Sequence, residues 1–484
     1  MVYGQYYRNK IAKITVKWFL RPRTLASALY LTAVACVIAT MLMSFSQIFH
    51  GHPTTLPSAA QQWSIHFLTE TGFHGMNFTN STEKNGTKVI WTHPELDILH
   101  MKPFQFLSQY KNPCWYEPLY TTNVYQNNKY SLLSPNIAST MIRLMTEWST
   151  RLLQNQNAQR LRCLPYFFII GQPKCGSTDL FRRILYHPDV VSPPIKELHW
   201  WSRNRMGKRI NYTDIIPLSD YIDMFDQAAI QIERRGHDSK YQIVTGEASV
   251  SVMWENDDWW HFPENIGQEE PLYTTGDYIK HLLPKLKIII ILRNPTERLF
   301  SDYLYFNPTA NKSVTDFHNR VNFSVQLYEN CFRNHSIRHC IYNTTIGMAS
   351  QVRLRVGLYS AYLKDWMKLF PTEQILIVTL KEYSEKILKT MKKVFKFLNL
   401  RALTKQQYAE MKRLKRQNKR KFKDQRVGTM LKETQMLLKR FYGPFDDKLC
   451  KLLGISRESL WETNETQKNS SHGKNAPIVD DDVI

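Results

Sequence analysis

The fold is decided by the stretch YFFIIGQPKCGSTDLFRRILYHPDVVSPPIKELHWW, residues 166–201. It opens with the apolar run Tyr166–Ile170, whose aromatic and β-branched residues predict a buried strand. A turn from Gly171 to Gly176 follows, and the apolar side chains after Ser177 fall on one face of a helix. Such a unit directs free backbone N–H groups and the positive end of the helix dipole to one point. That point suits a phosphate group.

The loop differs from the phosphate loop of nucleotide triphosphatases. In the pattern GxxxxGK[ST] the lysine directly follows the second glycine, whereas Lys174 precedes Gly176 by two residues. A P-loop sugar kinase would need that lysine, as well as a carboxylate after a strand to hold Mg²⁺. Glycine-rich turns after strands are also common in α/β proteins, so the loop alone leaves its ligand open.

A second element, Lys196-Glu197-Leu198-His199-Trp200-Trp201, lies downstream of the loop. The order P-K-x-G-[ST]-T together with K-E-x-H-[FW]-[FW] resembles the Golgi glycosaminoglycan sulfotransferases, which use 3′-phosphoadenosine 5′-phosphosulfate (PAPS). In that family the loop holds the 5′-phosphosulfate and the glutamate is the catalytic base. The resemblance implies that Glu197 is the base and that His199 orients it or shares its task. Lys174 would stabilise the departing phosphate oxygen.

A third element follows the run Lys287–Leu292 (KIIIIL), which predicts the clearest buried parallel strand in the chain. The run leads into Arg293-Asn294-Pro295, and a proline near the first turn predicts a helix that begins at the carboxyl edge of a sheet. The pattern R-[DN]-P-x-x-R-x-x-S-x-Y resembles the 3′-phosphate motif of the same family. It implies that Arg293 and Ser301 bind the 3′-phosphate. Alternatively, Arg293 caps a surface helix and Ser301 is an ordinary helix residue.

A weaker match is R-x-x-x-G-x-Y at Arg353–Tyr359, which resembles the family's third nucleotide-contacting element. It implies that Tyr359 lies near the adenine or the phosphates, although Tyr359 could equally belong to the core. PAPS would be the sulfuryl donor and PAP the product. No metal is expected to be required, because lysine and helix dipoles supply the positive charge. The expected cofactor contacts are Lys174, Cys175, Gly176, Ser177, Thr178, Arg293, Ser301 and Tyr359.

Two groups of basic residues are candidates for binding an acidic acceptor. Arg203, Arg205 and Lys208 follow the candidate base, although a charge run is more often a solvated face. Residues 405–426 hold ten basic and two acidic residues, where relatives have a basic loop that closes over the nucleotide. Relatives often have Glu-Lys-Ser where this chain has Ala248 in place of the lysine. A second catalytic lysine at that position is therefore in doubt.

The net charge of +22 indicates a polyanionic partner, and the N-terminus argues against nucleic acid. Residues 25–49 contain no Asp, Glu, Lys or Arg, which is enough for a hydrocarbon core of ~30 Å, and only basic charges precede them. This predicts a signal anchor with a cytosolic N-terminus, since the apolar region of a cleaved signal peptide is usually shorter. The expected segments are a cytosolic tail (1–24), the anchor (25–49), a luminal stem (50–95), the catalytic domain (96–462) and a disordered tail (463–484).

Sequons and cysteines also favour a luminal body. Among the seven cysteines, Cys331 and Cys340 bracket a short polar loop and predict a disulfide, and Cys114 with Cys163 is a second, weaker prediction. Cys450 is left over, and no Cys/His spacing resembles a zinc site. Ten N-x-[ST] sequons predict glycosylation, at Asn77, Asn80, Asn85, Asn211, Asn311, Asn322, Asn334, Asn343, Asn464 and Asn469.

Shorter patterns predict further elements. Helical spacing favours a helix over Ile137–Leu153, and Gln242–Gly246 and Gln374–Val378 favour strands. Residues 254–276 are aromatic and acidic with turn signals, which is typical of a surface insertion lining a cleft. The run Phe441–Phe445 is expected to open the final helix.

These elements predict an α/β fold with a P-loop-like parallel sheet flanked by helices, the sulfotransferase fold, after one N-terminal transmembrane helix. The expected location is the Golgi membrane, single-pass and type II, with the catalytic domain in the lumen. The motifs TGEASVSVMW, ERLFSDYLYFNPT and VGLYSAYLKDW resemble enzymes that sulfate C-6 of N-acetylgalactosamine 4-sulfate in chondroitin or dermatan sulfate. The alternatives are an enzyme of the heparan sulfate type and a catalytically inactive polyanion-binding membrane protein. A homo-oligomer is left open.

Overall fold

The computed structural model describes residues 98–133, 135–155, 158–207, 215–239, 242–308, 312–417 and 422–461. The chain divides into two compact units, residues 1–82 and 83–484, and only the second contains described residues. The expected cytosolic tail, anchor, stem and C-terminal tail all lie outside the described residues. Within the described ranges, no helix combines the length and the apolar character needed to cross a bilayer.

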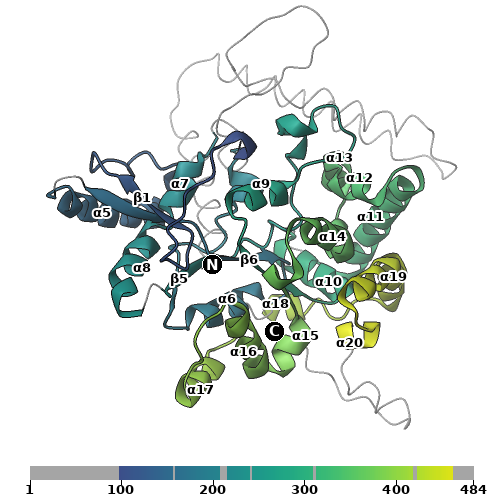
Figure 1. Ribbon diagram of the computed structural model, residues 1–484. Coiled ribbons are helices and arrows are strands. Elements are labelled where there is room, and N and C mark those ends of the chain that lie inside the picture. Colours follow the sequence, from purple (N-terminus) through teal and green to yellow (C-terminus); the bar gives the residue numbers. More distant parts are fainter. Residues whose placement is uncertain are drawn as a thin grey trace, which may run out of the picture. The chain divides into compact units, whose positions relative to one another are not determined.

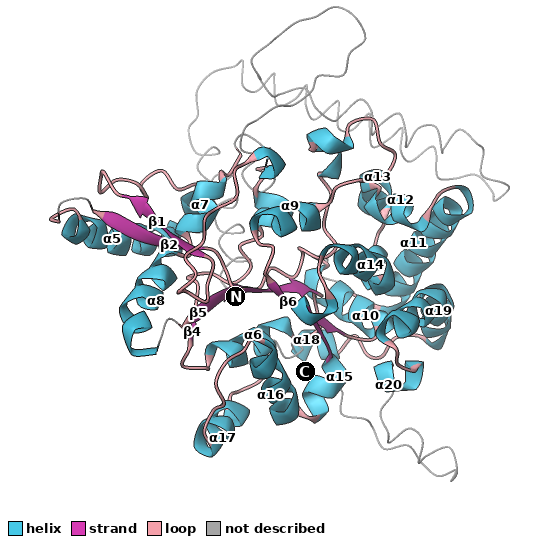
Figure 2. Cartoon of the chain, viewed as in Figure 1, coloured by secondary structure: helices cyan, strands magenta, loops and turns pink. Residues whose placement is uncertain are grey.

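A five-stranded parallel sheet lies at the centre of the second unit (Figures 1 and 2), as the sequence predicts. Its strand order is β4-β5-β3-β6-β7, so β3, which carries the phosphate loop, is the middle strand. The four predicted strands are confirmed within two residues at each end. The strands are β3 (Phe167–Gly171), β4 (Val190–Val191), β5 (Val244–Glu247), β6 (Lys287–Leu292) and β7 (Ile375–Thr379).

Helices cover both faces of this sheet, and Figure 1 shows α6, α16 and α17 below it and α7, α9 and α14 above it. The helices are α4 (Tyr130–Leu133), α5 (Pro135–Leu152), α6 (Ser177–Leu185), α7 (Leu218–Asp223), α8 (Asp226–Ser239), α9 (Thr275–Leu282), α10 (Pro295–Phe306), α11 (Val314–Asn334), α12 (Ile337–Tyr342), α13 (Thr344–Ala349), α14 (Tyr359–Leu369), α15 (Leu380–Glu385), α16 (Ile387–Phe397), α17 (Lys405–Arg413), α18 (Phe422–Gln425), α19 (Lys432–Leu453) and α20 (Arg457–Trp461).

Alternation along β3 divides the core into two apolar layers. Phe167 and Ile169 pack with α6 and α16 on one face, and Phe168 and Ile170 pack with α9 and α14 on the other. All four side chains are at most 1% exposed, because a parallel strand covered on both faces has no solvent side. The neighbouring strand approaches so closely that a Cβ at Gly246 would lie 2.3 Å from the Phe167 ring. Glycine is therefore required beside β3.

The structure contains two disulfides among the described residues, and both predicted pairs are confirmed. Cys114 and Cys163 join β1 (Cys114–Pro118) to β2 (Gln159–Cys163), an antiparallel ribbon just before β3. Cys331 and Cys340 join α11 to α12. Of the sequon asparagines in the described residues, Asn322 and Asn334 are exposed and Asn343 is half-buried. The other sequons and glycan occupancy stay predictions.

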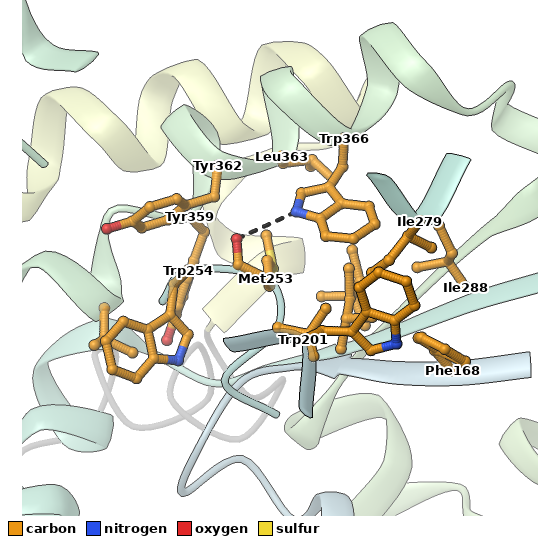
Figure 3. Packing of buried hydrophobic residues seen from close by; sticks show 14 of the residues in the cluster. Phe168, Trp201, Met253, Trp254, Ile279, Ile288, Tyr359, Tyr362, Leu363 and Trp366 are labelled. Atoms are coloured by element: carbon orange, nitrogen blue, oxygen red, sulfur yellow. Dashed lines mark hydrogen bonds between the residues drawn. The ribbon is translucent and has the colours of Figure 1, made fainter. Parts of the chain in front are cut away.

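The segment after β5 passes between β3 and α14 and belongs to the core, as Figure 3 shows around Met253. The Met253 N–H donates to the Ile170 carbonyl at 3.0 Å, and the indole of Trp366 donates to the Met253 carbonyl at 3.2 Å. The expectation of a surface insertion from residue 254 is wrong for three of its aromatic residues. Trp254, Trp259 and Phe262 are all less than 8% exposed, because they fill the layer below α9 and α14.

The expectation that Phe441–Phe445 opens the final helix is also wrong. These residues lie in the middle of α19, and Pro444 stands inside that helix. A proline in a helix interior costs ~3 kcal/mol or more. Phe441, Tyr442 and Phe445 are buried against α11 and α14, and this packing offsets the cost of the proline.

Candidate active site

The phosphate loop connects β3 to α6 at the carboxyl edge of the sheet. Gly176 is the N-cap of α6, and its φ of 85° lies in the left-handed region where a side chain would be strained. The first turn of α6 therefore presents unpaired backbone N–H groups at the predicted phosphate position. The strand, the turn and the helix form as the sequence predicts, which follows from the apolar run and the two glycines.

The side chains of the loop differ in what they can offer a ligand. Cys175 is completely buried, and burial raises the pKa of its thiol to about 11. It can therefore contribute only its backbone N–H, as Gly176 does. Ser177 is 6% exposed and Thr178 is half-buried, and both belong to the first turn of α6.

Lys174 is held in a partly desolvated position above an aromatic ring. Its ammonium group lies 3.5 Å from the centre of the Tyr305 ring, which belongs to α10. Burial lowers the pKa of Lys174 to about 8, with Asp302 raising this pKa and Arg293 and Arg353 lowering it. Three cations and one carboxylate thus share the neighbourhood of the loop. An added anion would be stabilised there.

Arg293 directly follows β6 and is held at both its backbone and its side chain. Its carbonyl oxygen accepts a hydrogen bond of 2.8 Å from the Tyr359 hydroxyl, and its Nε lies 3.1 Å from Glu297. Asn294 caps α10 by accepting from the N–H groups of Thr296 and Glu297, as the sequence predicts for a helix starting here. Ser301 is half-buried and lies within α10, four residues after Glu297, the ion-pair partner of Arg293.

Tyr359 belongs to the core, which corrects the expectation that its side chain contacts the nucleotide. The side chain is 1% exposed, and its hydroxyl is occupied by the Arg293 carbonyl. Burial raises the pKa of this phenol far above its ordinary value, so the group stays neutral. Tyr359 therefore holds the backbone at the end of β6 in place.

Arg353 is a site residue that sequence reasoning missed. Its Nε donates to Asp302 at 2.7 Å, a second N–H binds the other carboxylate oxygen, and its guanidinium lies 4.1 Å from the centre of the Phe306 ring. The side chain keeps 30% exposure and lies close enough to Lys174 to lower its pKa. The signal was present, since Arg353 is the first residue of the R-x-x-x-G-x-Y match.

Backbone strain concentrates at the predicted site. Lys174, Glu197 and His199 have φ values of 65°, 69° and 53°, and among the described residues only Asn399 is a further non-glycine residue with positive φ. Each left-handed residue costs of the order of 1–3 kcal/mol and persists only where its surroundings enforce it. The phosphate loop and the Lys196–Trp201 element are therefore built to fixed geometries.

Glu197 and His199 form a carboxylate–imidazole pair. The Oε2 atom of Glu197 lies 3.1 Å from Nε2 of His199, and the ammonium group of Lys196 binds Oε1. The Glu197 side chain is 29% exposed, so an acceptor hydroxyl can reach it. His199 is only 7% exposed, and this burial fixes the ring behind the carboxylate.

Two serines bind His199, and a third binds one of them. The His199 N–H donates to the Ser249 hydroxyl at 2.9 Å, and Nδ1 lies 2.7 Å from the Ser251 hydroxyl. Ser251 in turn lies 2.7 Å from the hydroxyl of Ser202. Ser249 and Ser251 follow β5, which neighbours β3, so the pair and the phosphate loop lie at the same edge of the sheet. Ala248 is buried in the core and supplies no cation.

The three expected acceptor-binding residues have different outcomes. Arg203 is 23% exposed and forms an ion pair with Glu255. The expectation for Arg205 is wrong, because this side chain is 2% exposed and lies over the rings of Phe262 at 4.6 Å and Tyr278 at 5.0 Å. A glycan at the surface cannot contact it. Lys208 lies outside the described residues.

The basic segment 405–426 packs on α6 rather than standing free, as far as it is described. The guanidinium of Arg183 donates to the carbonyls of Met411 and Leu414. The Gln417 N–H donates to Asp179 at 3.3 Å, in the first turn of α6. The segment thus lies next to the helix that carries the phosphate loop. Residues 418–421, four central residues of the run, are not described.

One group of metal-ligand type occurs in the described residues. Glu269, His335 and His339 have ligand atoms within 4.8 Å of one another. His335 precedes α12, His339 lies within it, and Glu269 belongs to the segment after β5. The group therefore includes none of the residues of the phosphate loop or of the Glu197 element. The expectation that no metal is required stays a prediction.

A cation-lined loop and a carboxylate–imidazole pair at one sheet edge define an enzyme that transfers an anionic group. The chain belongs to the sulfotransferase family, because the family model described as "Sulfotransferase domain" matches residues 164–442. Over 383 residues it is 44% identical to Carbohydrate sulfotransferase 15 of Mus musculus and 42% identical to that of Homo sapiens. Each match covers 76% of this chain and 68% of the relative.

A more distant relative is Heparan sulfate glucosamine 3-O-sulfotransferase 5 of Mus musculus. It is 26% identical over 49% of this chain and 54% of its own length. The relatives agree with the resemblance that the sequence motifs carry.

Proposed function

We propose that the protein transfers the sulfuryl group of PAPS to a hydroxyl of a sulfated glycosaminoglycan. The observation that carries the proposal is the contact of 3.1 Å between Glu197 and His199, held by serines beside the phosphate loop. This gives a base and an anion site at one edge of the sheet. Sulfuryl transfer to an alcohol needs both.

The residues around the loop fit the anionic groups of PAPS. Lys174, Arg293 and Arg353 outnumber the two carboxylates beside them, Asp302 and Glu297, and the first turn of α6 adds N–H groups. Lys174 and the loop would hold the 5′-phosphosulfate, and Arg293 with Ser301 would hold the 3′-phosphate. The planar guanidinium of Arg293 suits bidentate binding of a phosphate.

In the proposed reaction the acceptor oxygen forms a bond to sulfur as the bond from sulfur to the bridging phosphate oxygen breaks. Glu197 accepts the hydroxyl proton, and the negative charge passes to the departing phosphate. Lys174 stabilises that charge in a position that is already desolvated, where electrostatic stabilisation is strongest. The products are the sulfate ester and PAP.

The acceptor we favour is C-6 of N-acetylgalactosamine 4-sulfate in chondroitin or dermatan sulfate. The subfamily motifs support it, and so does the 44% identity to a relative named as a carbohydrate sulfotransferase. An enzyme of the heparan sulfate type is the alternative, and the relatives with such names are only 23–26% identical.

The test incubates the purified full-length chain and its Glu197→Gln variant with labelled PAPS and four acceptors. These are desulfated chondroitin, chondroitin 4-sulfate, dermatan sulfate and heparan sulfate. We expect label only with the 4-sulfated acceptors and 4,6-disulfated disaccharides after digestion. Label in heparan sulfate alone would assign the alternative acceptor. PAP binding without transfer to any acceptor would indicate an inactive polyanion-binding protein.

We further propose that the chain is a type II protein of the Golgi membrane with residues 50–484 in the lumen. Support comes from the uncharged segment 25–49, the ten sequons and the two disulfides, which persist in oxidising compartments. In intact microsomes, the chain should be protected from protease except for a short tail and should shrink on treatment with N-glycosidase. Cleavage of residues 98–461 by the protease would indicate the opposite topology.

A further inference from the structure

A second carboxyl group lies behind the Glu197–His199 pair and is not part of the proposed reaction. Glu247 is the last residue of β5 and is 1% exposed. Both of its oxygens are engaged, since Oε2 accepts a hydrogen bond of 2.7 Å from the Tyr221 hydroxyl and Oε1 accepts from the Ser249 hydroxyl. An acceptor sugar or a nucleotide cannot touch so deeply buried a group.

Both hydrogen-bond donors connect Glu247 to the element that carries the candidate base. Ser249 accepts the backbone N–H of His199 at 2.9 Å, and His199 is one of the strained left-handed residues. Tyr221, on α7, stacks on the Trp200 ring with centroids 5.2 Å apart. Glu247 thus fixes His199 through one oxygen and the following tryptophan through the other.

We propose that Glu247 is a positioning residue for the Glu197–His199 pair, and that its own charge is coupled to the charge of Glu197. This inference rests on the proposed function for its catalytic consequence. The coupling itself concerns two carboxyl groups of this chain and is independent of any substrate.

The charged and titratable groups that face Glu247 come from two elements. Tyr221 belongs to α7, and Glu197 and Lys196 belong to the KELHWW element, with His199 one serine hydroxyl away. Burial raises the pKa of Glu247 to about 7. Hydrogen bonds from Ser249 and Tyr221 lower it, and the charge of Glu197 raises it further. A nearby carboxylate disfavours ionisation, so the charge of Glu197 acts on Glu247.

The sign of the coupling follows from these contacts. Below about pH 7 Glu247 is neutral, and the charge of Glu197 meets no second negative charge. Above about pH 7 Glu247 is ionised, and a second negative charge then lies behind the Glu197–His199 pair. The plot of kcat against pH should therefore show a step near pH 7, in addition to the change caused by protonation of the catalytic base.

The first test measures kcat against pH from 5.5 to 9, at saturating PAPS and acceptor, for the wild type and Glu247→Gln. Glutamine keeps the shape and an acceptor oxygen but carries no charge. We expect kcat to fall about 10- to 100-fold through misplacement of the pair, and the step near pH 7 to disappear. PAP affinity should stay within about twofold.

Ser249→Ala should lower kcat similarly but keep the step, because Glu247 remains titratable. Asp446→Asn is the matched control, since burial also raises the pKa of Asp446, to about 6, and it lies on α19.

A second readout needs no turnover. In full-length protein labelled at histidine, the His199 ring signals, assigned with His199→Ala, should shift around pH 7 in the wild type and lose that shift in Glu247→Gln. If the wild type shows the shift but transfers no sulfate, the proposed function is contradicted while the coupling between the two carboxyl groups is supported. Identical pH profiles and identical His199 titrations in wild type and Glu247→Gln would overturn the inference. A Glu247→Gln protein that also loses PAP binding would reduce Glu247 to a residue of the general fold.

Discussion

The ammonium group of Lys174 lies 3.5 Å from the centre of the Tyr305 ring, so the loop lysine rests on an aromatic face of α10 rather than in water. A cation over an aromatic ring is attracted to its negative face, but the ring replaces only part of the lost hydration. The lysine is therefore ready to exchange this partner for a better one, such as a phosphosulfate.

This relationship predicts a pH dependence of cofactor affinity. In the free protein burial lowers the pKa of Lys174 to about 8, whereas a bound dianionic group would raise it. PAP affinity should be flat below about pH 7 and fall by up to about tenfold per pH unit above pH 8, because binding then takes up a proton. Calorimetry from pH 6.5 to 9.5 measures this. Lys174→Arg stays charged and should abolish the dependence. If the PAP affinity of the wild type does not change up to pH 9.5, Lys174 does not bind the cofactor.

Arg293 and Arg353 should differ in which ligands they affect. Arg293→Ala should weaken PAP binding by ~1.5–3 kcal/mol, the value of a charge-assisted hydrogen bond, and leave 3′-dephosphorylated analogues nearly unchanged. Arg353→Ala should weaken both ligand types, because it leaves Asp302 to attract Lys174 away from the loop. Titration of both variants with PAP and adenosine 5′-phosphosulfate distinguishes these outcomes. Equal losses for both ligands in Arg293→Ala would make this arginine structural.

Glu197→Gln separates the chemical step from cofactor binding. The amide keeps the shape and a hydrogen bond but accepts no proton, so kcat should fall by ~10²–10⁴-fold while PAP affinity stays near the wild-type value. Lys174→Ala should lose both affinity and turnover. Single-turnover transfer and PAP calorimetry on the two variants provide the comparison. Near wild-type transfer by Glu197→Gln would mean that Glu197 serves only as the ion-pair partner of Lys196.

Arg205 should affect stability and not acceptor binding. Its guanidinium is enclosed by aromatic rings, burial lowers its pKa to about 10, and its two terminal nitrogens have no hydrogen-bond partner in the described structure. Arg205→Met should keep or raise thermal stability, because an apolar residue of similar size avoids the desolvated charge. The acceptor KM should stay unchanged. Arg203→Ala is the comparison, and an acceptor KM that rises for Arg205→Met would contradict the buried position.

The sequence predicts the central part of the fold because its signals are local. The apolar run before Gly171 and the run Lys287–Leu292 each specify a strand that is buried on both faces. Gly176 and Pro295 mark the helix starts that follow these strands. Parallel strands bring their carboxyl ends to one edge, so the phosphate loop and Arg293 could be expected together.

What the sequence does not predict depends on contacts between distant segments. The burial of Arg205 requires rings from Phe262 and Tyr278, more than 50 residues away. Tyr359 turns inward because the Arg293 carbonyl offers its hydroxyl a partner. Pro444 reads locally as the start of a helix, yet packing of α19 overrides that signal. In each case tertiary packing outweighs a local preference.

The disulfide between Cys114 and Cys163 has a practical consequence for producing this enzyme. It closes a loop of 49 residues directly before β3, and loop-closure entropy assigns such a bridge about 4 kcal/mol. A bridge spanning nine residues, such as Cys331–Cys340, is assigned about 2.6 kcal/mol. A typical domain has only 5–15 kcal/mol of net stability. In the reducing cytoplasm of a bacterial host the disulfides would not form, and the protein would therefore lose much of its free energy of unfolding. Secretion into an oxidising compartment is the route to soluble, active material.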